Sequence, residues 1–291
     1  MDAPTDPGWT ALGQGRWATA RDGRRLHHVV LGVGSPIVVF ETGMGASRGS
    51  WGAVAPGVAR HTTAVVYDRA GLGRSPSDAA PRTLERAVDD LEDLLGSLGD
   101  GPFVLAGHSY GGPIVRALAD RRPELVAGLV LVDQTDETCP LYFDDAMMRQ
   151  QRMLVTALPW LARLRVLRVV TARTARRLPT GVRAELVAED STVATAEGMR
   201  GEMAHFDADL TRLRDEPLST PDVPVTLISG TAPSRTAART RDALVASHRA
   251  RAAWLPQGRF VEASRSGHLI PLSEPQIVID EVLRIVDQVE A

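Results

Sequence analysis

The chain has 291 residues, of which 44% are hydrophobic and 24% charged, with a formal net charge of −3. A chain of this length buries roughly 75% of its unfolded surface, enough for one large α/β domain or a domain with an inserted cap. The charge balance gives no basis for nucleic-acid binding, and no run approaches the ~18 apolar residues of an integral membrane segment. All 33 basic residues are arginine, which excludes a lysine base and Schiff-base chemistry.

Cysteine content and the N-terminal sequence bear on the compartment. Cys139 is the only cysteine, so no intrachain disulfide can form. The N-terminal sequence MDAPTDPGWTALGQG contains early acids and prolines and no apolar run, unlike a signal peptide. We therefore expect a cytoplasmic protein. The segment 205–209 (HFDAD) superficially suggests metal ligands, but no other His or Cys clusters with it, so we expect neither a metal nor a cofactor.

In the first half of the chain, apolar runs alternate with helical patterns, as in a parallel sheet with helical crossovers. Several runs are almost continuously apolar, which is typical of strands covered on both faces. The strands are expected at residues 26–31, 37–41, 63–68, 103–108 and 126–133. Apolar residues at helical spacing predict helices over 51–59, 84–98 and 110–121.

The alternation stops after residue 133 and resumes near residue 217. Residues 134–216 contain no convincing strand, and we interpret them as an inserted helical cap on a core formed by 1–133 and 217–291. One expected cap helix, 160–170, interleaves Leu and Val with arginines. The basic stretch around 163–177 has two readings: an element on a membrane surface, or the commoner solvated cap face. Beyond the cap, the patterns predict strands at 225–230 and 259–263 and helices at about 236–247 and 275–289.

The strongest motif is GHSYG at residues 107–111, which matches G-x-S-x-G between an apolar strand and a helix. A strand-to-helix turn this sharp holds its serine in a strained backbone conformation, and Gly107 and Gly111 supply the room that flanking side chains would take. The hydroxyl then stands at a helix N-terminus, where backbone amides favour a developing anion. These features predict Ser109 as a nucleophile.

Three motifs carry a family resemblance: FETGMG at 40–45, YDRAGLGRS at 67–75 and GHSYGG at 107–112. With them the sequence resembles the α/β-hydrolase fold family over nearly its whole length. The resemblance implies an α/β fold with a mostly parallel eight-stranded sheet and helices on both faces. It also implies that His268, in SRSGHLI after the last strand, is the general base, and a neutral imidazole suits that task. His108 is interpreted as a packing residue.

The resemblance also implies an oxyanion hole built from backbone amides. One donor belongs to the loop after the strand that ends at Glu41, where the Thr-Gly pair at 42–43 points to the amide of Met44. The second is the amide of Tyr110, directly after the nucleophile.

The acid that orients the histidine departs from the usual family pattern, because most relatives carry it just after the seventh strand. Here no acidic residue follows residues 228–230 until Asp242. Other relatives place the acid at the end of the sixth strand, where Asp133 stands, and we predict Asp133. Asp136 is the second candidate and Glu41 the third. An imidazole without such a carboxylate loses much of its effectiveness as a general base.

The predicted function is hydrolysis of a carboxylic ester, lactone or thioester through an acyl-enzyme on Ser109. Dehalogenase and epoxide-opening relatives generally use an aspartate nucleophile, which the serine argues against. Alternatives are an acyltransferase, a carbon–carbon hydrolase or a cyclase, or a catalytically weak ligand-binding protein. Methionines gather in the cap, and methionine adapts to varied apolar shapes. We therefore expect a small lipophilic substrate, in a pocket lined partly by Trp51, Met147, Met148, Met153 and Trp160.

Overall fold

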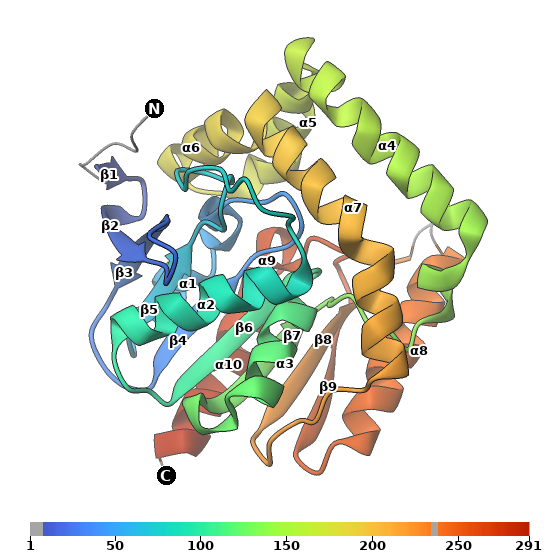
Figure 1. Cartoon of the computed structure of the whole chain (residues 1–291). Coiled ribbons are helices and arrows are strands. Elements are labelled where there is room, and N and C mark those ends of the chain that lie inside the picture. Colours follow the sequence, from blue (N-terminus) through green and yellow to red (C-terminus); the bar gives the residue numbers. More distant parts are fainter. Residues whose placement is uncertain (1–7, 234–237, 291) are drawn as a thin grey trace.

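A nine-stranded, mostly parallel sheet forms the centre of the computed structural model, which describes residues 8–233 and 238–290. The strand order is β1-β2-β3-β5-β4-β6-β7-β8-β9 (Figure 1). Pairing is parallel from β5 through β4 to β9 and antiparallel among β1, β2, β3 and β5. The strands are β1 (Trp9–Thr10), β2 (Gly13–Thr19), β3 (Arg25–Leu31), β4 (Ile37–Glu41), β5 (Ala64–Tyr67), β6 (Phe103–His108), β7 (Val126–Val132), β8 (Val225–Gly230) and β9 (Gly258–Ala263).

The predicted fold class is confirmed, and each strand expected from an apolar run is present with its ends within one residue. The sequence pattern missed β1 and β2, and the sheet has nine strands where eight were expected. These two strands form one edge of the sheet, and β2 has the sequence GQGRWAT, in which glycines and polar residues replace an apolar run. An edge hairpin of this kind carries little of the hydrophobic signal that marks a central strand.

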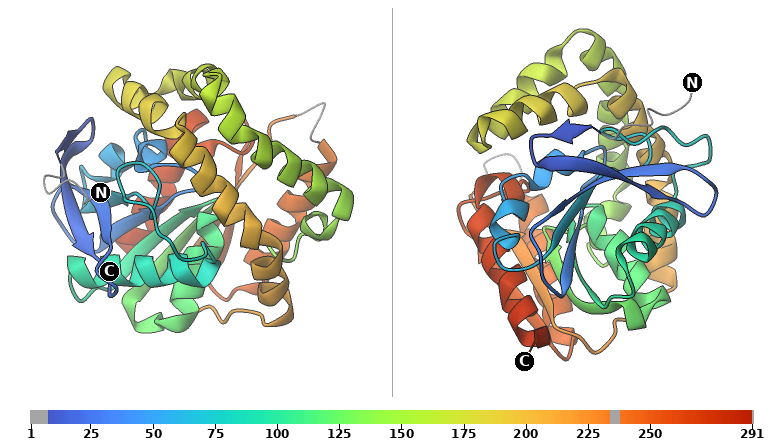
Figure 2. Two further views of the ribbon diagram at one scale, coloured as in Figure 1. Left: turned by 45° about the horizontal axis from the view of Figure 1, so that its top comes forward. Right: turned by 90° about the vertical axis from the view of Figure 1, so that its left-hand side faces the viewer.

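Alternation along the central strands divides the interior into two cores. Val38 and Phe40 of β4 face one core, and Val39 between them faces the other, because successive side chains of a strand point to opposite faces. One core is closed by α1 (Ala55–Val58) and α10 (Pro275–Glu290), and the other by α2 (Leu84–Leu98) and α3 (Gly111–Arg121). The right-hand view of Figure 2 shows these helices on opposite sides of the sheet. Helix α8 (Ala238–Trp254) packs on β8 and β9, and the Thr236 start predicted for it lies outside the described residues.

Between β7 and β8 the chain forms a layer of helices over one end of the sheet (Figure 2). These are α4 (Asp145–Arg163), α5 (Val166–Thr174), α6 (Thr180–Asp190) and α7 (Val193–Asp215). The single helix expected over 160–170 is instead two, because α4 ends at Arg163 and Arg165 takes a left-handed conformation with φ 59°. No helix in the described part of the chain is both long and apolar enough to cross a membrane.

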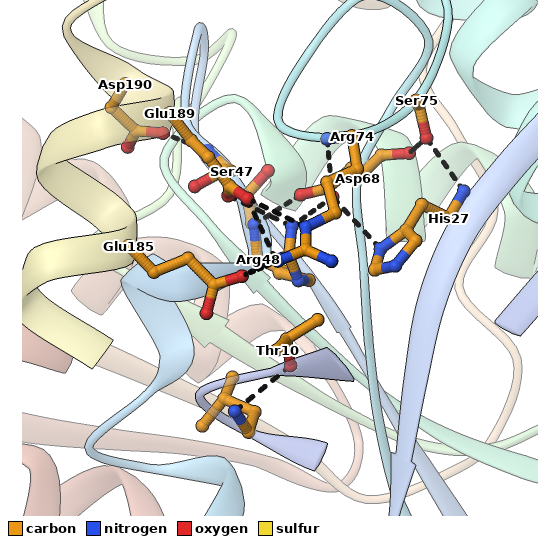
Figure 3. Close-up of polar contacts among 12 residues, drawn as sticks. Thr10, His27, Ser47, Arg48, Asp68, Arg74, Ser75, Glu185, Glu189 and Asp190 are labelled. Carbon is orange, nitrogen blue, oxygen red and sulfur yellow. Dashed lines mark hydrogen bonds and ion pairs between the residues drawn. The ribbon is translucent and has the colours of Figure 1, made fainter. Parts of the chain in front are cut away.

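A buried ion cluster joins α6 to the core (Figure 3). The guanidinium of Arg48, 1% exposed, bonds to the carboxylates of Asp68, Glu185 and Glu189. Arg74 bonds to the same two glutamates, at 2.8 Å from Glu185 and 3.2 Å from Glu189. A buried cation that is paired with several carboxylates costs much less than an unpaired one. The cluster therefore fixes α6 against the loops that follow β4 and β5.

Asp190, at the end of α6, makes this junction sensitive to pH. Its Oδ1 accepts from the amide of Ser47 at 3.2 Å. Burial, with a smaller contribution from the charges of Asp68 and Glu189, outweighs the hydrogen bonds from Ser47 and raises the pKa of Asp190 to about 7. The folded state thus holds this proton to higher pH than the unfolded chain does. Folding stability from this group is present at low pH and is lost as pH rises from ~4 to about 7.

Asp190→Asn should therefore stabilise the protein at alkaline pH. The amide keeps an acceptor for Ser47 but carries no charge to be buried, so the free energy of unfolding should exceed the parent's by about 2 kcal/mol at pH 8. At pH 4 the two proteins should differ little. Urea unfolding at both pH values measures the difference. If the free energies of unfolding of the two proteins differ by the same amount at pH 4 and pH 8, Asp190 is ionised at both pH values.

Candidate active site

Ser109 stands on a strained turn between β6 and α3. Its φ is 54°, in a region that non-glycine residues rarely occupy. A Cβ added to Gly107 would lie 2.5 Å from the carbonyl oxygen of Gly111, and one added to Gly111 would lie 2.6 Å from that of Glu41. The amide of Ser109 donates to the carbonyl of Val132 at 3.1 Å, which fixes the turn to the end of β7. A side chain at either position would collide with the backbone, so the turn requires both glycines.

A hydrogen-bonded chain runs from Ser109 to Asp133 through His268. His268 Nε2 lies 2.9 Å from Ser109 Oγ, and His268 Nδ1 lies 2.6 Å from Asp133 Oδ2. Because a carboxylate only accepts, Nδ1 carries the proton and Nε2 is free to accept from the hydroxyl. The imidazole is half exposed, whereas Asp133 is fully buried at the end of β7. This arrangement can remove a proton from Ser109 and hold it.

Arg241 also binds Asp133, a contact that sequence reasoning missed. Its Nη1 donates to Oδ1 at 3.0 Å and to Oδ2 at 2.8 Å, and the amide of Gly230 donates to Oδ1 at 3.0 Å. Burial alone raises the pKa of Asp133, but the hydrogen bond and charge of His268 and the charge of Arg241 outweigh it, so the pKa is well below its usual range. Asp133 is therefore an ion with three partners. One feature of the sequence could have indicated this contact: Arg241 follows β8, the strand after which most relatives carry the acid.

The two alternative acids lie in other ion pairs. Asp136 accepts from Arg251 Nε at 2.7 Å and Nη2 at 2.8 Å. Glu41 accepts from the hydroxyl of Tyr67 and from Arg69. Within the described residues neither carboxylate hydrogen-bonds to His268, so Asp133 is the candidate that the structure brings to the histidine.

The two amides expected to bind an oxyanion belong to segments that lie beside Ser109. A Cβ built on Gly43 would lie 3.2 Å from Cβ of Ser109, which places the loop after β4 against the serine. In the part of the chain that the structure describes, the amides of Met44 and Tyr110 donate to no protein acceptor. Because neither amide is engaged by a protein acceptor there, both are available to donate to a substrate oxygen.

Charged side chains under this loop hold it in place. Arg69 Nη2 donates to the carbonyl of Gly43 at 2.8 Å, and Arg69 Nε donates to Glu202 at 2.9 Å. Glu202 belongs to α7 and accepts from the amide of Gly45 at 2.8 Å. The position of the loop therefore depends on a helix from the layer above the sheet.

A cavity of about 620 Å³ opens on Ser109 and His268. Its wall is mainly apolar, with Tyr142 and Phe206 among its aromatic members. Four methionines contribute to it: Met44, Met147, Met199 and Met203. An apolar cavity with a few polar groups at one end is typical of a small-molecule site.

Of the five residues predicted to line the pocket, only Met147 lies on this wall. Trp51 is fully buried beside Phe40 and His108, and Met148 packs in the core. Met153 and Trp160 point outward, with 67% and 65% of their surfaces exposed. The reason is the helical phase of α4: the cavity takes residues 147, 151, 154 and 155, and residues 153 and 160 fall on another face.

Residues 38–281 match the model of the alpha/beta hydrolase family. The chain belongs to this family. The chain is 34% identical over 108 residues to RutD of Azorhizobium caulinodans, a protein named as a carbamate hydrolase. This alignment covers 37% of the chain and 40% of RutD. The chain is 52% identical over 66 residues to the lipase LipV of Mycobacterium tuberculosis, covering 23% and 25%. The alignments thus span less than half the length of these relatives.

Solved structures agree with the fold. An esterase from Thermogutta terrifontis has a TM-score of 0.70 and 22% identity, with the match covering 96% of the present chain and 100% of the esterase chain. The epoxide hydrolase CorEH has a TM-score of 0.68 and 19% identity, covering 94% and 99%. At these identities the likeness is one of fold.

His108 supports the loop that carries His268. Its Nε2 lies 2.9 Å from the backbone carbonyl of His268, and the two rings are 4.8 Å apart. Burial, together with the neighbouring His268, lowers the pKa of His108 to about 3, so the ring is neutral and donates from Nε2. The packing role expected for His108 therefore comes with a hydrogen bond that the sequence did not indicate.

In the described residues no group of three or more His, Cys, Asp or Glu could hold a metal.

Proposed function

We propose that the hydrolase cleaves carboxylic esters with a lipophilic acyl group through an acyl-enzyme on Ser109. The observation that carries this proposal is the hydrogen-bonded chain from Asp133 through His268 to Ser109, which opens on an apolar cavity beside the two amides expected to bind an oxyanion. The relative named lipase supports the choice of an ester.

In the first half of the proposed reaction, His268 Nε2 takes the proton from Ser109 as Oγ bonds to the carbonyl carbon. The amides of Met44 and Tyr110 donate to the oxyanion of the tetrahedral intermediate. Asp133 stabilises the imidazolium, which returns its proton to the departing alcohol. Water then attacks the acyl-enzyme with His268 as base, and the free acid leaves Ser109.

Trapping of the acyl-enzyme tests the proposal. Rapid acid quench during turnover of a p-nitrophenyl ester, followed by mass spectrometry, should find one acyl group on the peptide that contains Ser109. Product analysis should find the free acid. Turnover without an adduct, or an acyl group transferred to an added alcohol in preference to water, would contradict hydrolysis through this serine.

The cavity predicts a preference for longer acyl groups. Each methylene that enters an apolar site contributes up to about 0.8 kcal/mol, so kcat/KM should rise by up to about 4-fold per added carbon from acetate toward octanoate. Met147→Ser, on the cavity wall, should flatten this rise. Met153→Ser, on the outer face of the same helix, should leave it unchanged. A flat series for the parent would show that the cavity does not hold the acyl chain.

Replacement of Arg241 should shift the pH dependence of kcat/KM. Its charge lies beside Asp133 and offsets part of the negative charge that stabilises the imidazolium of His268. In Arg241→Met the carboxylate of Asp133 loses this cation and should hold the imidazolium more strongly, so the acid limb of kcat/KM should move to higher pH. Arg241→Lys keeps the charge and should keep the limb in place. The same shift in both variants would indicate misplacement of Asp133 rather than loss of charge.

A further inference from the structure

The corner where α4 meets α5 exposes a cluster of large apolar side chains. Helix α5 buries none of its residues, although an amphipathic helix normally buries one face. In Figures 1 and 2, α4 and α5 meet at the end of the helical layer that lies away from the sheet. We call this surface the α4–α5 corner, and its exposed apolar members are Trp160, Leu164, Val166, Val169 and Val170.

Arginines surround these apolar side chains. Residues 146–184 contain nine arginines and no aspartate or glutamate, in a chain whose net charge is −3. At the corner itself, Arg163, Arg165, Arg168, Arg173 and Arg176 are all exposed. Across the described ranges none of these five has a carboxylate within ion-pair distance, whereas the arginines that face the core are paired, as Arg48 and Arg69 are. The corner is thus basic without internal compensation.

We propose that the α4–α5 corner docks on the surface of an anionic lipid assembly. Apolar side chains would enter the boundary between headgroups and acyl chains, and the arginines would bind phosphate oxygens, as basic amphipathic helices do. The pattern favours lipid over an acidic protein because the arginines alternate with the apolar side chains on a projecting corner. Arg163 also stacks on Trp160, with its guanidinium carbon 4.8 Å from the ring centroid, and tryptophan is enriched at membrane–water interfaces.

The same helix connects this surface to the cavity. Leu154 of α4 is 61% exposed and also lines the cavity wall, with Met147 and Gln151 on the same side. Trp160, by contrast, lies on another face of α4 than these cavity residues. Docking of the corner therefore does not depend on the proposed function.

Vesicle binding tests the proposal. The Ser109→Ala protein, which should not turn over lipid, is sedimented with vesicles of phosphatidylcholine containing about 30 mol % phosphatidylglycerol and with vesicles of phosphatidylcholine alone. We expect binding to the anionic vesicles to be at least about 10-fold stronger and to be lost near 0.5 M salt, because screening removes the attraction of surface charges.

Variants locate the contact. The triple variant R163Q/R165Q/R168Q and the single variant Trp160→Ser should each weaken vesicle binding several-fold. Trp254→Ser is the matched control, because this tryptophan is 75% exposed and lies on α8, outside the corner. Equal binding to both vesicle types, or binding unchanged in the triple variant, would overturn the proposal. So would binding to an acidic polypeptide but not to vesicles, or self-association that Trp160→Ser abolishes.

Turnover separates this proposal from the proposed function. Each surface variant, with Ser109 intact, is assayed on a soluble p-nitrophenyl ester, and its rate should equal the parent's. Failure of vesicle binding with turnover intact would remove only the docking proposal. Failure of turnover with vesicle binding intact would remove only the ester hydrolase.

Discussion

Ser109→Ala should lower kcat for a p-nitrophenyl ester by about 10⁴ to 10⁶-fold. The change removes Oγ, the atom that would bond to the carbonyl carbon, and leaves the amides of Met44 and Tyr110 in place. Alanine takes the same backbone conformation at φ 54° with the strain that serine already bears, so the turn and the thermal unfolding temperature should be preserved. The residual rate should come from water attacking an ester held in the oxyanion hole.

The measurement is steady-state hydrolysis with enough protein to detect a rate of about 10⁻⁵ of the parent's. Labelling with a fluorophosphonate provides the control: the parent should react once and Ser109→Ala not at all, which also measures contamination by active enzyme. If the alanine variant keeps more than about a tenth of kcat, another residue or a bound water attacks the ester, and the elbow serves only as a structural turn.

Local signals in the sequence were enough for the parts of the site that one segment determines. The elbow at 107–111 combines an apolar strand, two necessary glycines and a helix, and each acts within a few residues of Ser109. Asp133 could be predicted because the carboxyl ends of neighbouring parallel strands meet at one edge of a sheet. Strands β6 and β7 are such neighbours, with His108 opposite Val132 in the register.

Contacts between distant segments could not be predicted in this way. Arg241 reaches Asp133 across 108 positions of the chain, and no periodicity relates the two. The prediction of the residues that line the cavity failed for another reason. Met147, Met148 and Met153 are all apolar, so the pattern of α4 does not say which face meets the core, which the cavity and which solvent. That choice is made by the packing of α4 on α7 and α5.

Asp133→Asn should lower kcat by about 10³ to 10⁴-fold. The asparagine oxygen should stay on Gly230 and Arg241, because both donate to the present carboxylate. Its NH₂ group would then face Nδ1 of His268, which must become an acceptor. The imidazole proton moves to Nε2, where it donates to Ser109 and can no longer accept from it.

Asp136→Asn is the matched control, since Asp136 is equally buried at the same strand end and is also paired with an arginine, Arg251. It should keep kcat within a few-fold while losing stability. The comparison separates two roles that a carboxylate here can have. If both variants lose activity alike, the edge of the sheet tolerates no loss of charge and Asp133 acts through structure. If Asp133→Asn alone is inactive with unfolding unchanged, the carboxylate acts through the tautomer of His268, and Arg241 then adjusts how strongly that carboxylate holds the imidazolium.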